Sequence, residues 1–192
     1  MVLLRAPRAL LLLAVLLLVG TERAWADAQG ESGKTELEYQ VKAAFLFNFT
    51  KFVEWPSDVF TSPGDPVTVC VMGDDSFGES LDAVVQGETV NGRRLKVHRT
   101  RSPAELRACH MLFVPRSERR QSELLSSLRG AGILTVGDGD GFLSDGGIIR
   151  FVLDQNRVRF EINHAAAEAN RLKLSSKLLR LARRVYTEQP GD

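Results

Sequence analysis

The residues best suited to bind a ligand lie in the segment Arg157–Asn163 (RVRFEIN). Side chains of a strand alternate between its two faces, so Arg159 and Glu161 share one face. Asn163 stands where a helix is expected to begin, and the free N–H groups at a helix N-terminus favour an anion. We predict that Arg159, Glu161 and Asn163 bind a small anionic or polar ligand. The alternative is a surface Arg–Glu ion pair followed by an ordinary helix cap.

Two cysteines, Cys70 and Cys109, are the second candidate for chemistry. An even number of cysteines in an exported chain favours a disulfide, so we predict that they are joined. The alternative is a pair of buried free thiols. Neither the cysteines nor the three scattered histidines have the spacing of a metal site, and we expect no metal and no cofactor.

The loop Gly137–Gly141 carries Asp138 and Asp140, with Asp145 close behind, and these carboxylates could suit a hard cation. The loop lacks the distal glutamate of a calcium-binding loop, and we interpret it as a solvated turn after a strand. The sequence also lacks a nucleophile-elbow motif and a glycine-rich phosphate loop. We therefore predict no catalytic residues, and a hydrolase with an unrecognised site is the least favoured interpretation.

The first expected helix, residues 35–54, offers a candidate contact for a partner. It should end at Trp55-Pro56, because the residue before a proline is disfavoured in the helical conformation. Helical periodicity places Phe47 on a polar face beside Lys51, away from the core face. We predict that Phe47 and Lys51 contact a partner, unless another element covers Phe47. The expected core face consists of Val41, Phe45, Phe49 and Phe52.

The last expected helix runs from Asn163 to Tyr186 and carries a basic stripe. Its cations recur at the spacing of one helix face, opposite an apolar face. Such a stripe could meet an acidic partner or anionic lipid, although a solvated face is the simpler interpretation. The residues of this predicted partner surface are Lys173, Lys177, Arg180 and Arg184.

Strands that alternate with helices must position these residues, which predicts an α/β fold. We expect a single three-layer domain, with a mostly parallel sheet flanked by helices, a C-terminal antiparallel hairpin and a long terminal helix. The expected strands are Val67–Met72, Arg94–Arg99, His110–Val114, Ile133–Val136, Gly147–Leu153 and Arg157–Ile162.

The N-terminus has the pattern of a secretory signal peptide: two arginines, a ten-residue apolar run and the small residues of Ala24-Trp25-Ala26. The apolar run is too short for a membrane anchor, which needs roughly 20 residues. We expect cleavage after Ala26, a flexible segment over 27–36, the α/β domain over 37–187 and a disordered tail over 188–192. The net charge of +1 gives no indication of nucleic-acid binding.

The segment Tyr39–Pro56 (YQVKAAFLFNFTKFVEWP) resembles the opening of the YfiR family. Three later segments, Ile148–Val152, Val158–Asn163 and Leu172–Leu179, are similar to the ending of that family. The resemblance covers nearly all of the chain after the expected signal peptide.

The resemblance implies a periplasmic repressor, often a homodimer. Such a protein binds the periplasmic sensor region of an inner-membrane diguanylate cyclase and holds the enzyme inactive, and its release raises cyclic di-GMP and promotes biofilm. Cys70 and Cys109 match one disulfide of the family, whereas a second pair, found in some members near Gly141 and Ile148, is absent. Ligand contacts of the family would fall on Arg159 and Glu161, although members differ at the second position.

We therefore expect a non-enzymatic periplasmic regulator of a membrane signalling protein. A signal can release a partner only if it binds two states of the repressor unequally. The strand-to-helix junction at Arg159, Glu161 and Asn163 is the expected signal site. The alternative is a free-standing periplasmic module that binds a small anionic or polar solute at the same junction.

Overall fold

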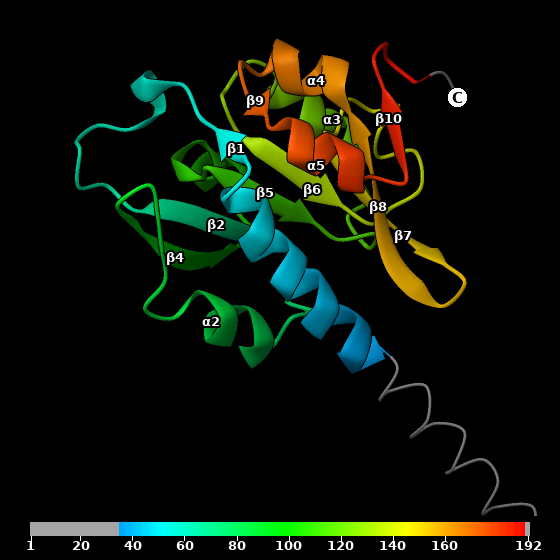
Figure 1. Ribbon diagram of the computed structural model, residues 1–192, viewed down its shortest axis with the longest axis horizontal. Helices are drawn as coiled ribbons and strands as arrows, with labels where there is room; N and C mark the ends of the chain where they lie inside the picture. The colour runs from blue at the N-terminus through cyan, green and yellow to red at the C-terminus, as the bar shows by residue number, and fades with distance from the viewer. Residues whose placement is uncertain (1–34, 191–192) are drawn as a thin grey trace, which may run out of the picture. The chain divides into compact units, whose positions relative to one another are not determined.

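The computed structural model describes residues 35–190 (Figure 1). The expected signal peptide and its cleavage after Ala26 lie outside the described residues, as does most of the segment 27–36. The chain divides into two units, residues 1–38 and 39–192, and the second unit contains the fold. Among the described residues, no helix combines the length and the apolar character needed to cross a membrane.

The described part of the second unit is built around a sheet of eight strands in the order β10-β8-β7-β6-β5-β2-β4-β3. Neighbouring strands from β4 to β7 are parallel, β8 pairs with β7 as an antiparallel hairpin, and β10 pairs with β8 in parallel. The short β3 pairs with β4 in the antiparallel sense. The strands are β2 (Val67–Met72), β3 (Thr89–Val90), β4 (Arg93–Thr100), β5 (Met111–Val114), β6 (Leu134–Gly137), β7 (Ile149–Asp154), β8 (Arg157–Asn163) and β10 (Arg184–Tyr186).

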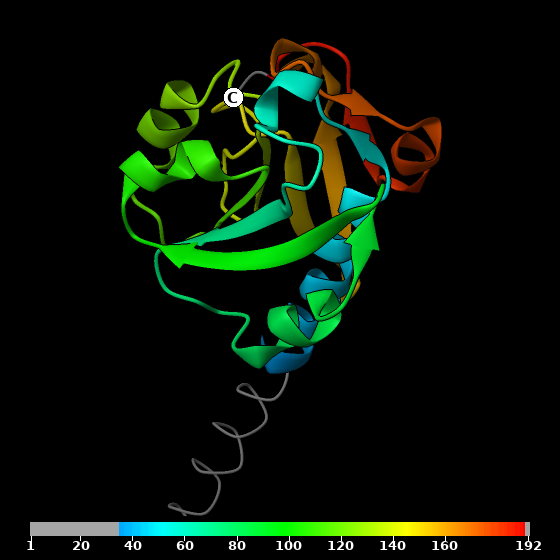
Figure 2. The same ribbon diagram turned by 90° about the vertical axis from the view of Figure 1, so that its left-hand side faces the viewer.

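Helices cover both faces of this sheet, which confirms the predicted mostly parallel sheet flanked by helices (Figure 2). Alternate residues of β2 face two separate cores: Val69 belongs to one and Cys70 to the other. The first core lies under a helix described over residues 35–50, with α2 (Glu79–Val85), α4 (His164–Ala169) and α5 (Ser176–Leu181). The second lies under the 3-10 helix η2 (Pro103–Ala108) and α3 (Gln121–Ser127).

The first helix ends earlier than predicted. It stops at residue 50, and β1 (Val53–Glu54) pairs with β9 (Lys173–Leu174) in a separate two-stranded sheet. The predicted core face is also displaced, because Val41 is 38% exposed. The residues of the first helix and β1 that lie in the core are Tyr39, Ala43, Leu46, Phe49 and Val53.

The predicted long helix from Asn163 to Tyr186 is wrong. The helix α4 ends at Ala169, and Arg171 adopts the left-handed conformation (φ 59°), which an α-helix cannot continue through. The amide of Leu172 then bonds to the carbonyl of Ala167. A second helix, α5, begins after Ser175, whose side chain accepts from the amide of Leu178. The four basic residues therefore do not form one helical stripe.

The C-terminal tail is partly held against the domain. Gln189 lies within the segment 188–192 that was expected to be disordered. Its Nε2 donates to the carbonyls of Leu143 (2.8 Å) and Ser144 (2.9 Å). Residues 191–192 lie outside the described part of the chain.

Candidate functional site

The first candidate site is the late strand β8, where Glu161 lies at the centre of an ion cluster. Glu161 is buried and stands opposite Arg150 of β7. Its Oε2 accepts from Arg150 (3.0 Å) and its Oε1 from Arg183 (2.9 Å). Arg183 also lies 3.5 Å from Asp154. Both oxygens of Glu161 are thus bound by arginines of the same chain.

The other two predicted ligand residues have different environments. Asn163 is fully buried: its Oδ1 accepts from the amide of Ala166 at the start of α4, and its Nδ2 donates to the carbonyl of Leu143. Arg159 is exposed, pairs with Val152 in the hairpin, and makes no hydrogen bond or ion pair to another described residue. The structure places the three side chains on one face of β8, but only Arg159 is available for a ligand. That they bind a ligand stays a prediction.

The residues predicted to contact a partner fall into two groups. The Nζ of Lys51 lies 3.8 Å from the ring centroid of Phe47, and the Nζ of Lys177 lies 5.2 Å from that of Phe52. The amide of Ser175 bonds to the carbonyl of Phe52, which fixes the start of α5 beside the end of the first helix. We call the set Phe47, Lys51, Phe52, Lys177 and Arg180 the basic-aromatic surface.

Two predicted partner residues lie apart from α5 in the chain. Lys173 belongs to β9 and is opposite Glu54 of β1. Arg184 belongs to β10, and its side chain donates to the hydroxyl of Tyr186. That hydrogen bond raises the pKa of Arg184 above its ordinary value.

The predicted disulfide between Cys70 and Cys109 is confirmed. Cys70 lies within β2, and Cys109 directly follows η2, two residues before β5. The bond therefore ties η2 to the sheet in the second core.

A buried polar cluster that sequence reasoning missed lies at the carboxyl ends of β5 and β6. Lys42, 1% exposed, reaches from the first helix to Asp138, with 2.5 Å between Nζ and Oδ2. The hydroxyl of Tyr39 and the amide of Arg116 also donate to this carboxylate. Burial and then the charge of Asp138 raise the pKa of Tyr39. The predicted solvated turn is wrong at Asp138, which is buried and paired. A lysine within an apolar helix face is the signal that could have indicated it.

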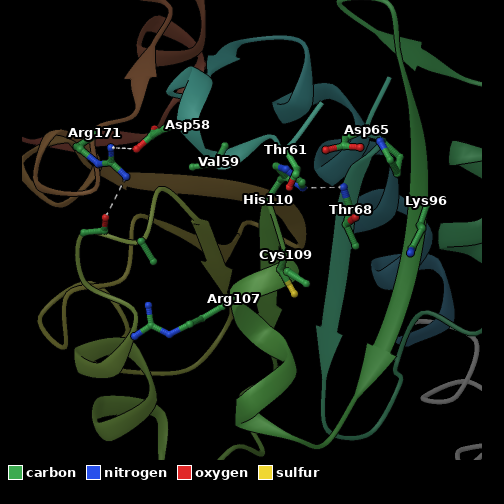
Figure 3. A pocket seen from close by; sticks show the side chains of 14 residues that line it. Asp58, Val59, Thr61, Asp65, Thr68, Lys96, Arg107, Cys109, His110 and Arg171 are labelled. Carbon is green, nitrogen blue, oxygen red and sulfur yellow. Dashed lines mark hydrogen bonds and ion pairs between the residues drawn. The ribbon is translucent and has the colours of Figure 1, made fainter. Parts of the chain in front are cut away.

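A cavity of about 570 Å³ lies at the amino ends of β2 and β5 (Figure 3). Both of its carboxylates already have partners within the chain. Asp58 pairs with Arg171 (2.7 Å), and Asp65 accepts from the amide and hydroxyl of Ser62. These hydrogen bonds lower the pKa of each carboxyl group. In contrast, Lys96 and Arg107 make no ion pair with any described residue.

His110 forms part of the same cavity wall. Its ring is stacked on Phe60, with 4.4 Å between centroids, and its Nδ1 accepts from the amide of Thr68 (3.1 Å). Burial lowers its pKa, although the nearby carbonyl of Val59 acts in the opposite direction. The Nε2 atom of the ring is buried and makes no hydrogen bond of normal geometry with a described residue. No described group of acidic, histidine or cysteine side chains has the arrangement of a metal site.

Comparison with known proteins gives one family match. A family model described as YfiR/HmsC-like matches residues 39–183. The comparison with curated proteins found no match. Among solved structures, the chain is similar to an ABC domain in complex with L-Trp from Streptococcus pneumonia (13% identity, TM-score 0.43) and to a conserved domain protein from Vibrio cholerae O1 biovar El Tor (11% identity, TM-score 0.46). Each similarity covers 62% of this chain and 54% of the other, about half of its length.

Proposed function

The chain belongs to the YfiR/HmsC-like family, and from this we propose that it is a regulatory protein of the periplasm. Its partner is the periplasmic sensor region of an inner-membrane signalling protein, in the first instance a diguanylate cyclase. Binding represses that enzyme and lowers cyclic di-GMP. The single observation that carries the proposal is the family match, which extends over residues 39–183.

The basic-aromatic surface is the part of the fold that we propose for docking. Lys51, Lys177 and Arg180 are exposed. The ammonium groups of Lys51 and Lys177 lie near the rings of Phe47 and Phe52, which are only partly buried. Leu181 of α5 adds an apolar side chain that is 56% exposed. Cations beside exposed apolar groups fit an acidic, amphipathic segment of a sensor domain. A homodimer is expected from the family and stays a prediction.

The alternative, a solute-binding module at the end of β8, has less support from the contacts. The carboxylate of Glu161 and the amide of Asn163 are already bound by groups of the same chain. Only Arg159 remains available to bind a signal molecule. Arg159→Ala is therefore expected to leave repression intact and to abolish the response to the signal.

The proposal is tested by cyclic di-GMP levels in cells. Deletion of the gene should raise cyclic di-GMP, and expression of the parent chain should restore the lower level. The double variant Lys177→Glu/Arg180→Glu should fold normally, because both side chains are exposed, yet fail to restore it. Arg94→Glu, on the exposed side of β4, is a control for charge reversal elsewhere on the surface and should behave as the parent. Unchanged cyclic di-GMP after deletion would contradict the proposal.

Co-purification from solubilised membranes gives a second, independent readout. The parent chain and the Arg94→Glu control should retain a membrane diguanylate cyclase, and the Lys177→Glu/Arg180→Glu variant should lose it. Equal retention by all three chains would place the docking surface elsewhere.

A further inference from the structure

The cavity at the amino ends of β2 and β5 is lined by three cations, Lys96, Arg107 and Arg171, and two carboxylates, which leaves a net positive charge of one. Its two acidic side chains, Asp58 and Asp65, are bound by Arg171 and by Ser62. Lys96 and Arg107 remain without an acidic partner among the described residues. Figure 3 shows them on opposite sides of Cys109. A ligand that satisfied both would need two separate anionic groups.

His110 forms part of the cavity wall through its ring. His110 is 8% exposed, and its Nδ1 accepts from Thr68, so the proton of the neutral ring lies on Nε2. That N–H has no acceptor among the described residues. Nε2 has almost no accessible surface, so this donor does not face the cavity, and His110 contributes its stacked ring to the wall.

The size of the cavity restricts the ligand further. About 570 Å³ lies within the range of small-molecule sites, roughly 300–1,000 Å³, and far exceeds the volume of an inorganic ion. The cavity is separate from the β8 cluster and from the basic-aromatic surface, since it shares no lining residue with either.

We propose that this cavity binds a small organic anion with two or more oxyanion groups, a di- or tricarboxylate in size and charge. Lys96 and Arg107 bind the anionic groups from the two sides of Cys109. Arg171, which is ion-paired with Asp58, also lines the cavity.

Citrate is the probe, and calorimetric titration of the purified chain without any partner measures its binding. Citrate should bind, and glycerol, which has the hydroxyl groups without the charge, should not. Loss of a charge-assisted hydrogen bond weakens binding by about 10- to 100-fold. Lys96→Gln and Arg107→Gln should each weaken citrate binding by at least about 10-fold. Arg94→Gln, an exposed cation on the same strand as Lys96 but outside the cavity, should bind citrate as the parent does.

The position of binding is tested by nuclear magnetic resonance. The indole N–H of Trp55 donates to the carbonyl of His110 (2.9 Å), so its signal should shift with citrate, together with the amide of Thr68. The proposal would be overturned if citrate did not bind, or if both cavity variants bound citrate as tightly as the parent chain does. Chemical-shift changes confined to β8 would also overturn it. These measurements use no membrane partner, so their outcome is independent of the proposed regulatory function.

Discussion

Removal of the Lys42 charge is expected to be among the most destabilising single changes in the domain. The side chains of Lys42 and Asp138 are 2% and 0% exposed, and their charged atoms lie 2.5 Å apart. Lys42→Met keeps the apolar stem but leaves the Asp138 carboxylate with the hydroxyl of Tyr39, the amide of Arg116 and the distant Arg116 guanidinium (3.7 Å). Breaking a buried ion pair by removing one partner costs roughly 3–5 kcal/mol.

The two remaining donors reduce that cost, so we expect a loss of about 3 kcal/mol in the free energy of unfolding. For a domain of this size, this corresponds to a fall in melting temperature of roughly 6–12 °C. Urea unfolding with the disulfide intact measures the loss directly. Trp55, the only tryptophan after the expected signal peptide, provides the fluorescence signal.

The double variant Lys42→Met/Asp138→Asn removes both charges and should recover part of the stability, because no uncompensated charge stays buried. Lys51→Met, an exposed position on the same helix, is the control and should change stability by less than about 0.5 kcal/mol. A loss below about 1 kcal/mol for Lys42→Met, or strictly additive effects in the double variant, would refute the argument.

Three further predictions follow from the described contacts. Replacing Cys70 and Cys109 by serine opens a cross-link with a sequence separation of 39 residues. The free energy of unfolding, measured in urea, should fall by about 4 kcal/mol. Thiol labelling of the unreduced parent should find no free thiol. Burial lowers the pKa of His110, so the unfolded chain binds more protons below about pH 6.5, and unfolding stability should fall as the pH decreases from 7.5 to 5. His110→Asn should flatten that slope, and an unchanged slope would assign it to other groups. Asn163→Ala removes the α4 cap and a buried bond to Leu143 and should lower stability by about 1–3 kcal/mol by thermal melting; a change below about 0.5 kcal/mol would show that neither bond matters.

The strands at the centre of the sheet could be predicted from the sequence because their patterns are unambiguous. All six residues of β2 are buried, as expected for a parallel strand covered on both faces. The hairpin of β7 and β8 followed from two apolar runs separated by a polar turn at Gln155 and Asn156, both of which have positive φ. The disulfide followed from the number of cysteines and the expected export alone.

The C-terminal region could not be predicted because its periodicity is compatible with a helix throughout. The break depends on two tertiary interactions: the pairing of β9 with β1 and the pairing of β10 with β8. Both partners are more than 20 residues away, so no local pattern indicates them. The predicted core face of the first helix was wrong for a similar reason. A lysine is expected at the surface. Lys42 is buried because it pairs with Asp138, which is distant in sequence.

The candidate site could be predicted only as far as side-chain alternation extends. Arg159, Glu161 and Asn163 do share one face of β8. The partners that occupy Glu161 and Asn163 come from β7, from Arg183 beyond α5 and from the loop at Leu143. The cavity around His110 combines segments from positions 58 to 171, and no single motif marks it.

The short strand β10 also has a consequence for solubility. It covers β8 along Glu161–Asn163, and the family match ends at residue 183, directly before it. A chain shortened to residue 183 would expose the backbone N–H and C=O groups of that part of β8. Unpaired strand edges of this kind recruit further chains into aggregates. We therefore expect a chain that ends at residue 183 to aggregate more readily than one that retains residues 184–186.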